Sequence, residues 1–124
     1  MGEIADETAS SGGDSLPLTF RRLKLGKIIG KRTYGGLMGS LGTPVLMDGM
    51  TLNVPTMRSW NENGWIVENE GVPPDIEVDQ TPAAVIRGHD PQLEKAIQLV
   101  LEELKDADSR KVKHPTYPIR DRRD

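Results

Sequence analysis

The sequence predicts an α/β fold in which short strands form a mixed sheet beside two helices. Residues 15–25 and 91–104 have the apolar spacing of amphipathic helices. Between them lie short apolar runs separated by glycine and proline turns, which is the pattern of short strands. The chain of 124 residues is long enough for one small domain. Its apolar fraction of 35% predicts a modest core that leans on further sequence or on another chain.

The composition argues against several classes of protein. A net charge of −3 and a pI of about 5.4 do not suit a general nucleic-acid-binding protein. The chain has no cysteine, and its two histidines, His89 and His114, lie too far apart in sequence to suggest a metal site. No apolar run is long enough to cross a membrane, and none has the pattern of a signal peptide. We therefore expect a cytoplasmic protein without metal that binds neither nucleic acid nor membranes.

The chain begins with a predicted strand, a glycine turn and a helix. Residues 1–5 are typical of the end of a buried strand, although a polar tail has a similar composition. In the helix, Asp14 lies in the first turn and basic residues lie in the last, as the helix dipole favours. Pro17 is tolerated near the start, and Gly26 is the predicted C-cap. The predicted buried stripe is Leu16, Phe20 and Leu23.

The turn before this helix holds two serines, and its chemistry suits a nucleophile. The N-terminus of a helix offers unpaired N–H groups and partial positive charge, which stabilise the oxyanion formed when a serine attacks a carbonyl. Gly12 and Gly13 have no Cβ, so a substrate can approach the backbone closely. The sequence Ser-Ser-Gly-Gly is also typical of an ordinary turn or helix cap, so these residues alone leave both interpretations open.

The middle of the chain predicts a strand followed by a glycine-rich segment. Residues 27–33 fit a strand with Ile28 and Ile29 buried. The next segment is either a tight turn that packs closely or a loop whose backbone lines a binding cleft. In the second interpretation Gly35 and Gly36 are binding residues.

Two turns and an edge strand are predicted further on. Asp48-Gly49 between apolar residues predicts a hairpin over residues 44–55. Trp60 and Trp65 flank the next turn and can pack across it. Residues 75–79 alternate polar and apolar side chains, as an edge strand or a half-buried strand does.

The C-terminal part contains the strongest helix signal. Residues 81–89 are a predicted connection with a helical turn, and Asp90 and Pro91 are the predicted cap and first residue of the helix. His89, just before the cap, is more typical of a structural or solvated histidine than of a catalytic one. Residues 106–124 are charged and predict a tail. One apolar face of the helix is formed by Leu93, Ala96, Ile97, Val100, Leu101 and Leu104.

Five segments in this order resemble the C-terminal half of the catalytic domain of tricorn-type serine proteases, which are relatives of the carboxy-terminal processing peptidases. The segments are residues 7–14, 25–36, 48–49, 68–78 and 88–93. The resemblance implies that residues 1–105 form this half, a partial domain with the crotonase/Clp-like ββα superhelix fold. It also implies hydrolysis of peptide bonds by a serine endopeptidase, and it calls for no cofactor.

The resemblance also implies roles for individual residues. Ser11 matches the nucleophile in the A-x-S-x-G-D pattern of residues 9–14, and the N–H of Gly12 would contribute to the oxyanion hole. Glu68 matches the catalytic glutamate, whereas local chemistry alone makes it a strand-end carboxylate that is more often simply exposed. The family pattern has an aspartate at the position of Gly12. Its histidine base comes from upstream sequence, and the ten residues before Ser11 contain no histidine.

The resulting hypothesis is half of a serine peptidase active site, inactive alone, that acts on peptides with a complementary N-terminal half or as a homo-oligomer. Sheet edges left open in such a half predict association by strand pairing. Two other hypotheses remain open from the sequence. One is a non-catalytic ββα assembly module. The other is a module whose glycine turn binds an anion such as phosphate or acyl-CoA, as crotonase relatives do.

Overall fold

A computed structural model describes residues 1–105 and 114–117. The tail predicted for residues 106–124 therefore lies outside the described residues, apart from 114–117, which are exposed. Within the described ranges, no helix is both long enough and apolar enough to cross a membrane.

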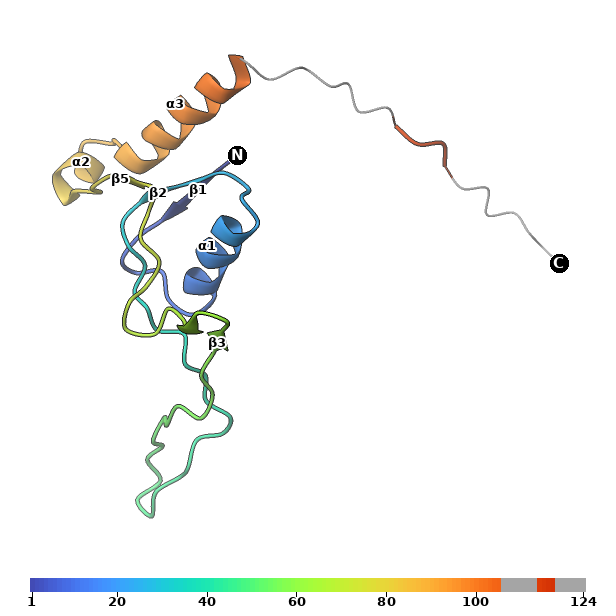
Figure 1. Cartoon of the computed structure of the whole chain (residues 1–124). Helices are drawn as coiled ribbons and strands as arrows, with labels where there is room; N and C mark the ends of the chain where they lie inside the picture. The colour runs from blue at the N-terminus through green and yellow to red at the C-terminus, as the bar shows by residue number, and fades with distance from the viewer. Residues whose placement is uncertain (106–113, 118–124) are drawn as a thin grey trace.

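The body of the molecule is a three-stranded parallel sheet with a helix on each face (Figure 1). Its strands are β1 (Gly2–Ala5), β2 (Lys27–Gly30) and β5 (Ile76–Glu77), in the order β1-β2-β5. The prediction of a mixed sheet is therefore wrong for this body. The antiparallel pairing that the turn signals indicated lies in a separate ribbon, β3 (Trp60–Asn61) and β4 (Gly64–Trp65), which does not join the sheet.

Helix α1 (Gly12–Arg22) links β1 to β2 and packs on one face of the sheet. It begins three residues earlier than predicted and buries Asp14, Pro17 and Phe20. The predicted stripe is thus wrong in two of its three members, since Leu16 and Leu23 are 61% and 63% exposed. The physical reason is at the helix start, where the side chain of Asp14 is anchored inside the body and turns the positions three and six residues later inward.

The end of α1 is closed by a residue other than the predicted glycine. Lys24 has a φ of 54°, its N–H donates to the Arg21 carbonyl at 3.0 Å, and the Leu25 N–H donates to the Phe20 carbonyl at 3.1 Å. These two bonds form a Schellman motif with Lys24 in the left-handed position. Gly26 lies beyond this cap, so its prediction as the C-cap is wrong.

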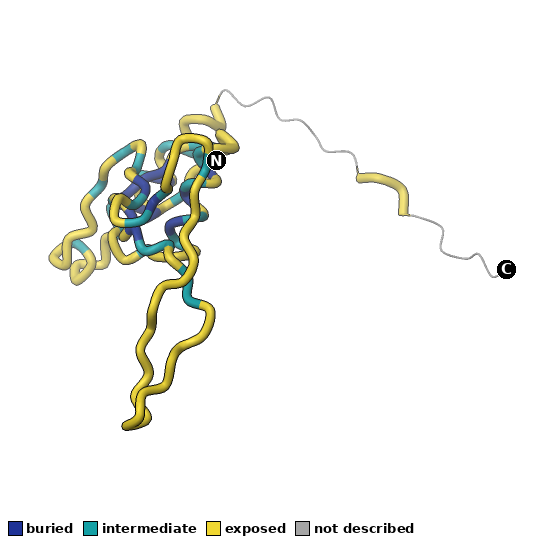
Figure 2. Tube along the Cα trace, turned by 60° about the horizontal axis from the view of Figure 1, so that its bottom comes forward, coloured by how far each residue is buried: buried dark blue, intermediate teal, exposed yellow. Residues whose placement is uncertain are grey.

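The core lies between α1 and the sheet, where the buried residues cluster (Figure 2). Ile28 and Ile29 have no exposed surface, as predicted, and they face opposite sides of the sheet because successive strand residues alternate. Ile28 joins the α1-side cluster, whose other buried members are Ala5, Phe20, Val67 and Val72. Ile29 lies on the side of α3, near Gly2 and Val100.

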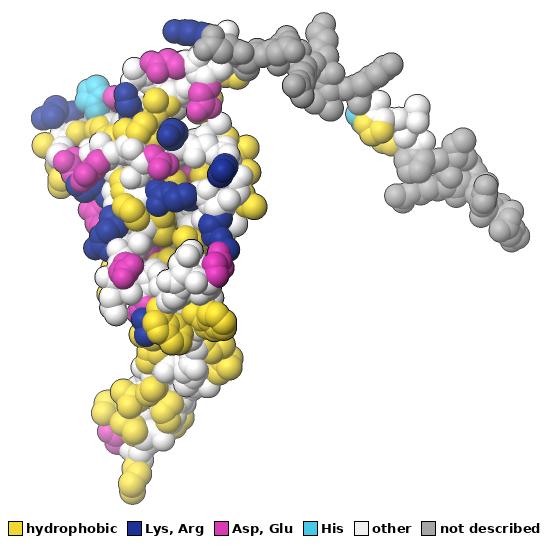
Figure 3. Space-filling model, viewed as in Figure 1, with side chains coloured by type: hydrophobic (Ala, Val, Ile, Leu, Met, Phe, Trp, Pro, Cys, Tyr) yellow, Lys and Arg dark blue, Asp and Glu magenta, His cyan; other side chains and the backbone are white. Residues whose placement is uncertain are grey.

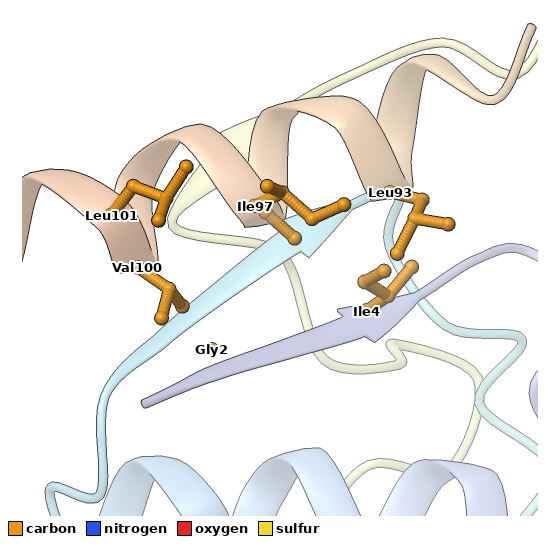
Figure 4. A pocket seen from close by; sticks show the side chains of 7 residues that line it. Gly2, Ile4, Leu93, Ile97, Val100 and Leu101 are labelled. Atoms are coloured by element: carbon orange, nitrogen blue, oxygen red, sulfur yellow. The ribbon is translucent and has the colours of Figure 1, made fainter.

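Helix α3 (Pro91–Lys105) covers the second face of the sheet in part (Figure 4). As predicted, Asp90 caps it, accepting the Leu93 N–H at 2.9 Å. The predicted helical turn before it is α2 (Pro82–Ile86). An apolar hollow lies between α3 and β1, and its lining includes five of the six predicted apolar-face residues of α3, with Gly2 and Ile4 opposite.

An arm of residues 39–57 projects from the body (Figures 1 and 2). Its two sides touch at the isolated bridges Gly39–Met57 and Val45–Thr51, and the Asp48-Gly49 turn closes its tip, as predicted. Large apolar side chains are exposed along it (Figure 3). At its base Trp60 and Trp65 lie directly opposite each other in the ladder, across the turn that they flank, and remain largely exposed.

Candidate active site

Ser11 lies in the turn between β1 and α1, at the N-cap of the helix, and is exposed. Its backbone has a φ of 56° and a ψ of −105°, a combination that a residue with a Cβ rarely adopts. The Ser11 N–H is held by the Asp14 Oδ2 at 2.9 Å and by the Gly36 carbonyl at 3.1 Å. The strained serine is therefore fixed through its backbone.

The hydroxyl of Ser11 donates no hydrogen bond to another described residue. Ser11 and Asp14 have the arrangement of a capping box, in which the Ser11 oxygen acts only as an acceptor, and the Asp14 N–H also donates to the Ser11 carbonyl at 3.0 Å. The N–H of Gly12 likewise has no acceptor within the described ranges, and the space beside its Cα is open. In contrast, the hydroxyl of the neighbouring Ser10 donates to the Gly36 carbonyl at 3.3 Å. A hydroxyl that has no acceptor and a free N–H thus lie side by side at the positive end of a helix.

Asp14 is the buried centre of this region, with no exposed surface. One carboxylate oxygen accepts the Thr33 hydroxyl at 2.5 Å and the Gly35 N–H at 2.8 Å, and the other accepts the N–H groups of Gly36 and Ser11, both at 2.9 Å. Burial is the largest single influence and raises the pKa of Asp14, but the four hydrogen bonds together outweigh it and hold that pKa below its ordinary value.

Glu68 lies in a strained turn on the other side of the glycine segment. It stands between Val67 and Asn69, whose φ values of 67° and 64° are unusual, above all for a β-branched valine. Its Oε2 accepts the N–H groups of Leu37 and Met38, each at 2.8 Å. Of the four non-glycine residues with positive φ in the described part of the chain, three lie at this site, the third being Ser11.

Residues 35–38, which we name the strap, connect the carboxylates of Asp14 and Glu68. Asp14 accepts the N–H groups of Gly35 and Gly36, and Glu68 accepts the next two. Ser11 is attached to the same strap through the Gly36 carbonyl. The structure thus brings Ser11 and Glu68 to one segment, without a direct hydrogen bond or ion pair between them. The binding role of Gly35 and Gly36 stays a prediction, and their N–H groups already serve Asp14.

Neither histidine belongs to this region. His89 lies at the entry to α3 with its Nδ1 3.2 Å from the Glu94 Oε1, and His114 contacts the Pro115 carbonyl and the Tyr117 ring. The hollow between α3 and β1 (Figure 4) is likewise lined by other residues than Ser11 and Glu68. The site is an exposed surface turn with one serine hydroxyl that has no acceptor and with no histidine beside it among the residues that the structure covers.

Sequence reasoning missed the part that Asp14 and Thr33 take in the site. The sequence predicts Asp14 only as a carboxylate in the first turn, where the helix dipole favours a negative charge. A signal was present, because an acidic residue three positions after a serine N-cap is the spacing of a capping box. Its remaining partners come from residues 33–36, and no local pattern indicates them.

Acidification is expected to lower the free energy of unfolding as Asp14 is protonated. Its folded-state pKa lies below that of the unfolded chain, so its stabilisation is complete above the unfolded value of about 3.9 and is lost as the pH falls through the folded value. Urea unfolding of the 124-residue chain and of Asp14→Asn between pH 6 and pH 2.5 measures this. The difference in free energy of unfolding between the unchanged chain and Asp14→Asn should become smaller below about pH 4. A difference that is independent of pH would contradict the assignment.

Asp6→Asn is the matched control. The pKa of Asp6 is also lowered, first by hydrogen bonds from Thr8, but this carboxylate is far less buried than Asp14. The pH-dependent change in the difference between Asp6→Asn and the unchanged chain should therefore be the smaller of the two.

Comparison with known proteins gives consistent matches. The model of peptidase family S41 matches residues 3–78. The tricorn protease of Thermoplasma acidophilum is 42% identical over 103 residues, which are 82% of this chain and 10% of that protein. A protein of Sulfurisphaera tokodaii, described as a tricorn-like protease C-terminal subunit, is 39% identical over 104 residues, 83% of this chain and 12% of its own length.

A solved structure agrees in fold. The crystal structure of the tricorn protease superposes with a TM-score of 0.75 at 42% identity, over 83% of this chain and 10% of that chain. This chain therefore spans about a tenth of the length of the relatives it matches.

Proposed function

The chain belongs to peptidase family S41, and we propose that it carries the nucleophile of a serine endopeptidase, Ser11. The observation that carries the proposal is the exposed Ser11 at the N-terminus of α1, held in a strained backbone conformation with a hydroxyl that donates to no described residue. A strained serine between a strand and a helix is the arrangement that presents a nucleophile in other hydrolases. The relatives named as proteases support the same reaction.

The proposed chemistry assigns a role to each neighbouring group. The Ser11 oxygen attacks the carbonyl carbon of a peptide bond, while its proton passes to a base. The negative charge that develops on the carbonyl oxygen is stabilised by the Gly12 N–H and by the positive end of α1. Because only the backbone of residue 12 is needed for this, glycine in place of the family's aspartate is compatible with it. Glu68 holds the strap through Oε2 and keeps Oε1 available for a polar partner.

The base and the remaining substrate-binding surface are proposed to come from another polypeptide segment. A serine hydroxyl is a poor nucleophile without a base, and His89 and His114 lie elsewhere. We propose that residues 1–105 form the C-terminal half of a crotonase/Clp-like ββα superhelix domain, with a complementary half that supplies the histidine. A relative described as a C-terminal subunit supports an assembly of this kind, acting on peptides. The chain alone is then expected to be inactive on peptides.

A fluorophosphonate probe tests the nucleophile directly. With imidazole as a soluble base, the Ser11 oxygen bonds to phosphorus, fluoride leaves, and the proton passes to imidazole. Mass spectrometry of the 124-residue chain should locate the added phosphonyl group on Ser11. Ser11→Ala should abolish the modification, a loss of at least about a hundredfold in rate.

Ser10→Ala is the matched control, because its hydroxyl is adjacent in sequence but bonded to the Gly36 carbonyl. It should label at the rate of the unchanged chain. Labelling that is lost in Ser10→Ala, retained in Ser11→Ala, or absent from the unchanged chain would overturn the assignment of the nucleophile.

A further inference from the structure

The carboxylate of Asp14 occupies a junction between three parts of the chain that are far apart in sequence. It accepts hydrogen bonds from the start of its own helix at Ser11, and from Thr33, Gly35 and Gly36, which lie 19 to 22 positions away. All four donors lie within 2.9 Å of a carboxylate oxygen, and the residue has no exposed surface. Each of its two oxygens accepts two bonds, which uses its capacity as an acceptor.

Capping of the helix alone does not account for this arrangement. A first-turn carboxylate that caps a helix needs one bond, to the N–H of the N-cap residue, and it normally lies at the surface. Here three of the four bonds reach a different segment, and they require the carboxylate to be buried. A buried carboxylate is unfavourable unless its hydrogen bonds compensate, so its donors are fixed in place together with it.

The junction continues from Asp14 to the turn that bears Glu68. The Thr33 hydroxyl that donates to Asp14 also accepts the Val72 N–H at 2.8 Å, and the Val72 carbonyl accepts the Thr33 N–H at 3.1 Å. The strap provides a second route, since its first two N–H groups bind Asp14 and its last two bind Glu68. Both of these routes between Ser11 and Glu68 pass through Asp14, and the bond from the Ser11 N–H to the Gly36 carbonyl joins Ser11 to the strap directly.

We propose that Asp14 is the positioning residue of the site, which holds the Ser11 backbone in its strained conformation and sets its location relative to Glu68. This inference rests on the proposed function of Ser11. The carboxylate does not touch the reacting atoms in this assignment. It acts by fixing the N–H of Ser11 and the strap, so that the hydroxyl and the Gly12 N–H keep one geometry before a substrate arrives.

The test compares labelling rates in chains that remain folded. In Asp14→Asn, one acceptor oxygen becomes an amide that donates, so two of the four backbone and hydroxyl donors lose their partner. The second-order rate constant for fluorophosphonate labelling of Ser11, with imidazole and at a temperature where circular dichroism shows the variant folded, should fall about ten- to a hundredfold.

Two variants separate positioning from a general effect on stability. Asp75→Asn weakens a carboxylate that binds the Ile28 N–H at 2.8 Å and pairs with Arg21, away from Ser11. It should lower the unfolding temperature and leave the labelling rate unchanged. Thr33→Val removes one bond to Asp14 and one to Val72, keeps the carboxylate, and should slow labelling by a smaller factor than Asp14→Asn.

The outcomes distinguish this inference from the function on which it rests. Labelling of Ser11 that is equally fast in folded Asp14→Asn overturns the positioning role and leaves the nucleophile intact. Equal slowing by Asp75→Asn also overturns it, because loss of stability would then explain the effect. Should Asp14→Asn fail to fold, Thr33→Val carries the test, and an unchanged rate in that variant overturns the inference. Failure of the unchanged chain to label overturns the nucleophile and the positioning role together.

Discussion

Replacing Gly30 with alanine is expected to destabilise the chain by about 2–6 kcal/mol, because two costs add. Gly30 has a φ of 124°, which L-residues with a Cβ avoid, at a cost of about 1–3 kcal/mol. An added Cβ would also lie 2.1 Å from the Ala5 carbonyl oxygen, so β1 and β2 must separate where they pair, at about 1–3 kcal/mol more. Urea unfolding followed by circular dichroism measures the loss.

Gly42→Ala provides the control for this prediction. Gly42 also has a positive φ, of 87°, but no atom lies within 4 Å of the position that its Cβ would take. Only the conformational cost applies there, so the loss should be about 1 kcal/mol. Similar losses at both glycines would mean that the approach of the Ala5 carbonyl to Gly30 does not constrain the sheet.

Replacing Phe20 with alanine is expected to cost about 3–5 kcal/mol. Phe20 is 7% exposed and is the largest side chain of a core cluster that has only four other buried members. A core of this size has few neighbours that can move into the space left behind, so most of the cavity persists. The change in the urea midpoint at constant slope gives the value.

Leu16→Ala tests the same helix on its exposed side. Leu16 is one turn earlier in α1 and is 61% exposed, so its removal should change stability by less than about 0.5 kcal/mol. If Leu16→Ala were as costly as Phe20→Ala, the face of α1 that packs on the sheet would be the one predicted from the spacing of Leu16, Phe20 and Leu23.

The helices and buried strands could be predicted because their signals are local. The Asp90-Pro91 start of α3 and the continuous apolar pair Ile28-Ile29 need no knowledge of distant residues. The stripe of α1 could not be predicted in the same way, since its orientation is decided by Asp14, whose partners are in residues 33–36. The buried carboxylate of Asp14, and not the spacing of Leu16, Phe20 and Leu23, therefore decides which face of α1 packs on the sheet.

The candidate site was also predicted only in part. Ser11 and Glu68 were selected by a resemblance in motif order, and local chemistry alone left each with an ordinary alternative. Their common attachment to the strap depends on the Gly36 carbonyl, which accepts the Ser11 N–H, and on the next two N–H groups, which bind Glu68. Backbone groups leave no trace in side-chain patterns. The importance of Asp14 was missed for the same reason.

The arm of residues 39–57 lies in the long connection between β2 and β5, two strands that pair directly. The entropy lost in closing this connection determines how well the chain tolerates insertions and deletions in the arm. The Ile28 N–H bonds to the Asp75 carboxylate across 47 positions, beside the parallel pairing of β2 with β5. The closure cost grows only with the logarithm of the loop length, so halving or doubling the excursion alters it by about 0.6 kcal/mol. The stability of the body is thus almost independent of the length of the arm. Insertions or deletions at the tip of the arm are therefore expected to leave the sheet and the strap undisturbed.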